Sequence, residues 1–130
     1  MVSALEAEPL YKITHQNTLN IKTQWLQINN LASDNFAQEN TEEAIRQTKY
    51  GLDYIEAIDA TSAEAIISLT NLARLYSYTN NLEMSVFYYK ITLSRLNTVV
   101  VSPNLFKSKL LLGLAYEYFR MLEIDQKKNY

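Results

Sequence analysis

Turn-forming residues are scarce in this chain, and their scarcity limits the folds that it can adopt. The 130 residues include two glycines and two prolines. Sandwiches and barrels need many turns, and those turns depend on glycine and proline. An α/β fold would also need glycines where its strands meet its helices. The sequence therefore predicts an all-α fold built from a few long helices.

The size and composition indicate one globular domain. A chain of 130 residues, 48% of them hydrophobic, is large enough to bury one core. We expect residues 11–124 to form this helical domain. Residues 1–10 are expected to be a flexible lead-in, and the polar residues 125–130 a flexible tail.

Several classes of protein and site are disfavoured by what the chain lacks. It has no cysteine, so disulfides and thiolate metal sites are excluded. Residues 1–10 carry two acidic side chains and no basic one, which is not the pattern of a secretory signal. No apolar run approaches the roughly 20 residues of a membrane span. We therefore expect a cytoplasmic protein with no membrane partner.

Charge is distributed unevenly along the chain. Residues 1–65 carry 4 basic and 10 acidic side chains, whereas residues 66–130 carry 8 and 4. Such a dipole can orient a charged partner or favour head-to-tail association between copies. We prefer the simpler interpretation, in which these charges solvate the outer faces of the helices. Because the net charge is −2 and the longest basic run is Lys127-Lys128, no nucleic-acid partner is expected.

Apolar residues that recur every three or four positions predict five helices. We expect them over about residues 10 or 17 to 36, 41–58, 61–80, 81–99 and 103–124. The segment Thr61-Ser62-Ala63-Glu64 has the pattern of a capping box, in which the threonine and the glutamate satisfy free amides reciprocally. Asn81 is expected to cap the fourth helix. Gly51 lies inside the second helix, where a glycine is tolerable if two helices approach closely.

One predicted helix pair carries a repeat motif. The third helix contains Leu69-x-x-Leu72-Ala73-x-x-Tyr76, and the fourth supplies Ser85 and Tyr89. A bulky residue, a leucine, a small residue and a tyrosine, followed by a small residue and an aromatic, resemble the tetratricopeptide (TPR) repeat. In that family the small residues of the two helices nest against each other, and this lets the backbones approach.

An earlier unit matches the same motif more weakly, as Ile28-x-x-Leu31-Ala32-x-x-Asn35. The interval between the two small residues is 12 in both units, from Ala32 to Ala44 and from Ala73 to Ser85. This agreement is the strongest evidence of repetition within the chain.

A third unit begins with Leu112-Gly113-x-x-Tyr116 and has no second helix. The motif leucines Leu31, Leu72 and Leu112 recur with a period of about 40 residues, against roughly 34 residues in the standard repeat. The helices or the links between units are therefore longer than those of a standard repeat, and the repeat subfamily stays open.

The resemblance implies that antiparallel hairpins stack as a short right-handed superhelix of about five helices. It also implies a concave face, lined by the first helix of each unit, that binds a peptide or a partner protein. The matching positions are Asn29, Asn30 and Ser33 in the first unit, Asn71, Arg74 and Tyr78 in the second, and Lys107, Leu111, Leu114 and Tyr118 in the third. Some family members clamp a terminal carboxylate with five residues, of which only Asn71 and Lys107 match, so that clamp is not expected.

These observations predict a protein-interaction module that acts as a scaffold or adaptor. The alternative is a small dimeric helical chaperone, or a fragment of a peptide-sensing regulator. A homodimer would form through the fifth helix, about 103–124, whose apolar residues are spread all round. An enzyme is not expected, because His15 is the only histidine and no phosphate loop or nucleophile motif is present. No cofactor or metal site is predicted.

Overall fold

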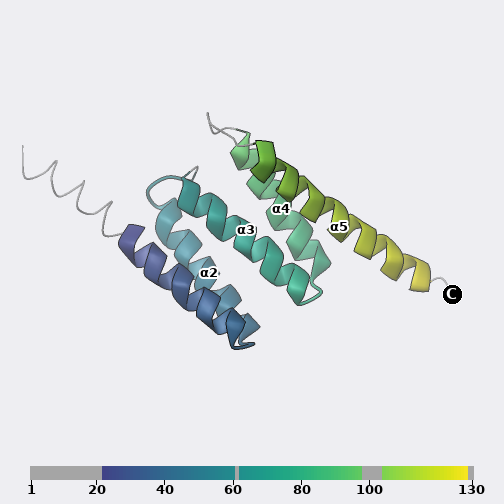
Figure 1. Cartoon of the computed structure of the whole chain (residues 1–130), viewed down its shortest axis with the longest axis horizontal. Helices are drawn as coiled ribbons and strands as arrows, with labels where there is room; N and C mark the ends of the chain where they lie inside the picture. Colours follow the sequence, from purple (N-terminus) through teal and green to yellow (C-terminus); the bar gives the residue numbers. More distant parts are fainter. Residues whose placement is uncertain (1–21, 61, 98–103, 129–130) are drawn as a thin grey trace, which may run out of the picture.

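The computed structural model describes residues 22–60, 62–97 and 104–128, and the regular structure within these ranges is entirely helical. Figure 1 shows the helices packed side by side in sequence order. They are a first helix, which covers residues 22–37 and carries no label in the figure, α2 (Thr41–Glu56), α3 (Ala63–Tyr78), α4 (Leu82–Leu96) and α5 (Asn104–Lys128). The prediction of an all-α fold of about five helices is confirmed.

The predicted helix boundaries differ from the observed ones mainly at the C-terminal ends. The helix α2 ends at Glu56, two residues before its predicted end. The helix α5 continues to Lys128, so residues 125–128 are helical and belong to the last helix. The expected lead-in, residues 1–10, and the start of the first helix lie outside the described residues.

Two short turns create two antiparallel hairpins. The first helix and α2 are joined by residues 38–40, and α3 and α4 by residues 79–81. In both turns one residue has a positive φ, 65° at Glu39 and 64° at Asn80. The next amides, those of Asn40 and Asn81, donate to the carbonyl five residues earlier at 2.8 and 2.9 Å. This is the hydrogen bond of a Schellman motif. The two hairpins therefore repeat the same turn, with Asn80 in the place of Glu39.

Side-chain caps fix the starts of α3 and α4. Asn81 accepts a hydrogen bond from the Met84 amide at 3.3 Å, as predicted. The predicted capping box is wrong by one residue, because Ser62 is the N-cap of α3 and accepts from the Ala65 amide at 3.1 Å. A capping box needs its glutamate at the third helical position, which Ala65 occupies. Glu64 instead forms a 3.6 Å salt bridge with the first helix.

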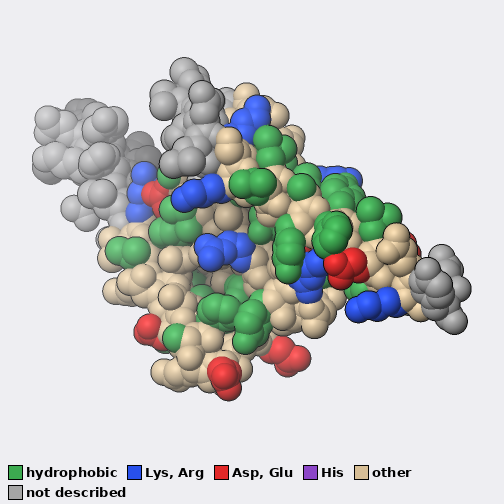
Figure 2. All heavy atoms as spheres, turned by 45° about the vertical axis from the view of Figure 1, so that its right-hand side comes forward, with side chains coloured by type: hydrophobic (Ala, Val, Ile, Leu, Met, Phe, Trp, Pro, Cys, Tyr) green, Lys and Arg blue, Asp and Glu red, His purple; other side chains and the backbone are tan. Residues whose placement is uncertain are grey.

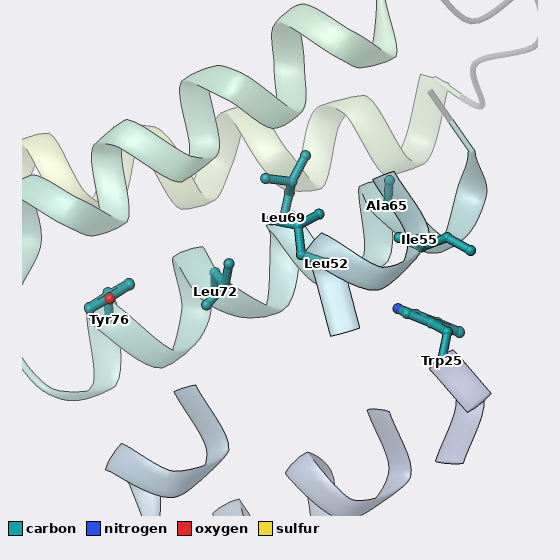
Figure 3. Packing of buried hydrophobic residues seen from close by; sticks show 7 residues of the cluster. All are labelled: Trp25, Leu52, Ile55, Ala65, Leu69, Leu72 and Tyr76. Carbon is teal, nitrogen blue, oxygen red and sulfur yellow. The ribbon is translucent and has the colours of Figure 1, made fainter. Parts of the chain in front are cut away.

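The helix α3 lies at the centre of the fold because it is buried on two sides. Figure 3 shows the cluster that it forms with the first hairpin, made of Trp25, Leu52, Ile55, Ala65, Leu69, Leu72 and Tyr76. On its other side it contributes to a second cluster with α4 and α5, made of Ile66, Ala73, Tyr89, Leu96 and Leu110. Two successive layers of core therefore share one helix, which is the packing expected of stacked repeats.

Close contacts hold the first helix against its neighbours. The indole Nε1 of Trp25 donates to the buried hydroxyl of Ser68 at 2.8 Å, which links the first helix to α3. A Cβ on Gly51 would lie 3.3 Å from a methyl group of Ile28. The first helix therefore approaches α2 closely at Gly51, which is the condition under which a glycine is tolerable there. The first contact joins the first helix to α3 and the second joins it to α2, so the first helix packs against both.

Candidate functional site

A groove with a volume of about 490 Å³ crosses the first helix, α3 and α5. Its base includes Thr48 of α2 and Tyr89 of α4, which occupy equivalent positions on the second helices of the two hairpins. The lining residues are Asn29, Ala32, Ser33, Phe36, Thr48, Asn71, Arg74, Leu75, Ser77, Tyr78, Tyr89, Gly113, Tyr116 and Glu117.

Five of the positions inferred from the TPR resemblance line this groove. They come from the first two units and are Asn29, Ser33, Asn71, Arg74 and Tyr78. Asn30 is exposed and does not line the groove. None of the third-unit positions, Lys107, Leu111, Leu114 and Tyr118, lines it either. Leu114 packs against the second core cluster, and the Tyr118 ring lies 5.6 Å from the Lys90 ammonium of α4.

The third unit is also shifted by one residue relative to the motif alignment. The motif match aligns Leu112 with Leu72, but burial aligns Leu110 with Leu69, which places the third unit one position further along the chain. Leu112 and Tyr116, which match the motif, are 70% and 59% exposed. With this shift the equivalents of Asn71, Arg74 and Tyr78 are Leu112, Ala115 and Phe119, and none of these lines the groove. The helix α5 instead contributes Gly113, Tyr116 and Glu117 to the lining.

Amide side chains bridge the first helix and α3 within the groove. Asn71 Nδ2 donates to Asn29 Oδ1 at 3.3 Å. The second polar atom of each amide, Asn29 Nδ2 and Asn71 Oδ1, forms no hydrogen bond within the described part of the chain. One donor and one acceptor therefore remain for a ligand, and this is the pair that a peptide backbone requires.

Aromatic rings form two other parts of the wall. Phe36 and Tyr78 meet edge to face, with ring centroids 5.0 Å apart. Tyr116 stands on α5, with the Arg120 guanidinium 5.6 Å from its ring. All three rings retain substantial exposure. They offer apolar contact area, and the two tyrosines add a polar tip.

A buried glutamate links α5 to α3 by a hydrogen bond at the edge of the groove. Glu117 is 1% exposed and accepts a hydrogen bond from the hydroxyl of Ser77. Arg120 lies 3.4 Å from the Glu117 carboxylate and donates to the Ser77 hydroxyl at 2.9 Å. The buried negative charge is thus paired and hydrogen-bonded, as burial of a carboxylate requires. The sequence reasoning missed Glu117, although it follows the buried Leu110 by seven residues on the same helix face.

Arg74 is the groove-lining charge that lacks such compensation. It is exposed, and it forms no salt bridge or hydrogen bond with any residue in the described ranges. Burial, with a smaller contribution from the Glu117 carboxylate, raises the pKa of Tyr89, and the Arg74 guanidinium opposes that rise. Arg74 therefore acts electrostatically at the base of the groove as well as at its rim.

No group of three or more histidine, cysteine, aspartate or glutamate side chains is placed to hold a metal ion within residues 22–60, 62–97 and 104–128. In the same ranges, none of the helices combines the length and apolarity of a bilayer-crossing segment.

Comparison of the chain with protein-family models, with curated proteins and with solved structures yields no match. The TPR resemblance therefore stays a prediction that rests on the motif residues and on their spacing.

Proposed function

We propose that this chain is a TPR-like protein-interaction module that holds a short segment of a partner protein in the groove between the first helix, α3 and α5. The observation that carries the proposal is Arg74, an exposed cation without an ion pair among the described residues, in a groove whose lining also includes two amides and four aromatic rings. In this role the chain acts as a scaffold or adaptor and performs no chemistry.

The groove chemistry specifies the kind of segment. A guanidinium pairs best with a carboxylate, through two parallel hydrogen bonds. The other charge in the groove, the Glu117 carboxylate, is not available to a cationic ligand because Arg120 and Ser77 already hold it. The ligand is therefore a peptide with an acidic side chain or a free C-terminal carboxylate at Arg74.

The amides and rings then position the rest of the peptide. Asn29 Nδ2 and Asn71 Oδ1 bond its backbone, and they do so without regard to side-chain identity. Phe36 and Tyr78 contact an apolar residue of the peptide, because their edge-to-face pair leaves ring surface exposed. Together these groups describe a peptide with one acidic group and a neighbouring apolar residue.

A peptide array with the full-length chain as the labelled probe tests this function. Each peptide is present with a free C-terminal carboxylate and as its C-terminal amide, and each acidic residue is also present as its amide counterpart. We expect binding to be concentrated among peptides that have an acidic group beside an apolar residue. An array without any preference for acidic groups would contradict the proposal.

Matched variants then locate the binding surface. Arg74→Gln should weaken the best peptide by about 10- to 100-fold, because a charge-assisted hydrogen bond contributes about 1.5–3 kcal/mol. Arg46→Gln is the control, since it removes the same charge from an exposed position on α2 outside the groove. Fluorescence polarisation measures both affinities. Equal affinities for Arg74→Gln and the unmodified chain would place binding elsewhere.

A further inference from the structure

The outer face of α5, opposite the core, is apolar and exposed. Leu112, Phe119 and Leu122 are 70%, 57% and 61% exposed. Figure 2 shows hydrophobic side chains gathered over the side of the molecule that α5 forms. We define the outer face as Leu111, Leu112, Ala115, Tyr118, Phe119 and Leu122, all of which are exposed. A contiguous apolar surface of this kind marks an interaction site.

The spacing of these residues is that of a helix-pairing seam. Leu112 and Phe119 are seven residues apart, and Ala115 and Leu122 are also seven apart and offset by three. These are the a and d positions of a heptad repeat. The seam lies on the side of α5 away from Leu110 and Glu117, which are buried against the rest of the fold. A second helix can therefore pack there without disturbing the core.

The charges beside the seam select the partner. Lys109 and Glu123 lie on the same flank of the seam, separated by two heptads, and both are exposed. When two copies of a helix pair antiparallel about a two-fold axis, a flank meets the same flank of the other copy in reverse order. With the axis near Tyr116, Lys109 of each copy faces Glu123 of the other. The charges on this flank of one copy are therefore complementary to those on the same flank of a second copy.

The same alignment also matches side-chain size. Ala115 of one copy lies opposite Phe119 of the other, so the smallest side chain of the seam packs against the largest. Leu112 lies opposite Leu122. Alternation of small and large side chains across facing positions is what allows two helix surfaces to interdigitate. Size and charge therefore agree on a single register.

We propose that two copies of this chain associate through the outer faces of their α5 helices, antiparallel and two-fold symmetric about Tyr116. Each dimer then contains two Lys109–Glu123 pairs, and the seam residues form its core. The proposal does not rest on the proposed peptide binding, whose cation Arg74 lies on α3.

Sedimentation and light scattering on the full chain over a dilution series provide the first test. The expected result is a reversible transition from the 15.0 kDa chain mass to twice that mass. Phe119→Asp places a charge in the centre of the seam and should abolish the dimer. Circular dichroism establishes that this variant stays folded, which is expected because Phe119 is exposed. A monomer at every concentration, or a dimer that survives Phe119→Asp, would overturn the proposal.

A charge swap tests orientation and register. Lys109→Glu and Glu123→Lys each replace two attractive pairs by two repulsive ones, and each should weaken the dimer by about tenfold at low salt. The double variant, which carries both changes, restores opposite charges and should return the dissociation constant to within about threefold of the unmodified chain. Glu42→Lys, at an exposed position on α2, is the control. Failure of the double variant to rescue the dimer would exclude the antiparallel register.

Discussion

The motif leucines provide the sharpest test of the stacked arrangement, because the same residue in the same local sequence has different surroundings. Leu31 and Leu72 both precede an alanine, and they occupy equivalent positions in the first two units. Leu72 is 0% exposed because α3 packs between the two core clusters. Leu31, on the first helix, is 52% exposed. We expect Leu72→Ala to be far more destabilising than Leu31→Ala.

The magnitude follows from the buried area that each change removes. A leucine-to-alanine change removes three carbons, which is about 2.4 kcal/mol of transfer free energy when all are buried, at about 0.8 kcal/mol each. An unfilled cavity adds to this, so Leu72→Ala should lower the free energy of unfolding by about 3–5 kcal/mol. Leu31 is half exposed and leaves no enclosed cavity. Leu31→Ala should therefore cost about 1 kcal/mol.

Urea denaturation at equilibrium measures both values. Circular dichroism follows all the helices, and the fluorescence of the single tryptophan, the buried Trp25, follows the first hairpin. The Leu72→Ala variant should also melt at least about 10 °C lower, since 1 kcal/mol corresponds to about 3–5 °C in a domain of this size. Equal losses in the two variants would show that α3 is not the central helix, and would refute the packing argument.

Three further predictions concern other buried contacts. Gly113→Ala should cost about 1–3 kcal/mol, because its Cβ would lie 2.7 Å from the Tyr89 ring; Gly51→Ala should cost less, because its Cβ would lie 3.3 Å from Ile28 and a gain in helix propensity of about 1 kcal/mol opposes this crowding; urea midpoints compare the two variants. Trp25→Phe and Ser68→Ala each leave one buried partner unpaired, but Trp25→Phe also removes part of a buried ring, so it should cost more than Ser68→Ala, and the double variant should be less destabilised than the sum of the two. Burial raises the pKa of Tyr89 above its unfolded value of about 10. The contribution of the protonated Tyr89 side chain to the free energy of unfolding is therefore complete below that pH, and it is lost as the pH rises through the folded pKa. Between about pH 9 and 11, the urea midpoint should therefore fall less in Tyr89→Phe than in the unmodified chain.

The parts of the fold that were predictable from the sequence are those where one helix face is clearly distinguished. In the first two units a small residue recurs after 12 positions, and Ala32, Ala44, Ala73 and Ser85 are all buried as that interval requires. Five of the six positions inferred for these units line the groove. Asn81 was predictable as a cap because asparagine is among the preferred N-cap residues, and its side chain accepts from the Met84 amide.

The third unit was not predictable in the same way, because apolar residues surround α5 and periodicity does not select one face. Leu112-Gly113-x-x-Tyr116 matches the motif letter by letter, yet Leu110 and Glu117 are the buried residues. A buried glutamate also runs against the expectation that a core stripe is apolar. Only its partners on α3 and α5, Ser77 and Arg120, make its burial tolerable. Sequence periodicity carries no information about such partners.

The two proposed interactions meet on one helix, and the register of α5 governs both. Gly113 and Glu117 face the groove, while Leu112 and Phe119 face outward. Tyr116 lies at the boundary, since it lines the groove and also stands at the centre of the proposed helix pair. A bound peptide and a second copy would thus both lie beside the Tyr116 ring. Any preference of the peptide for one position of that ring then changes the affinity of the second copy, and linkage requires the second copy to change the peptide affinity by the same factor.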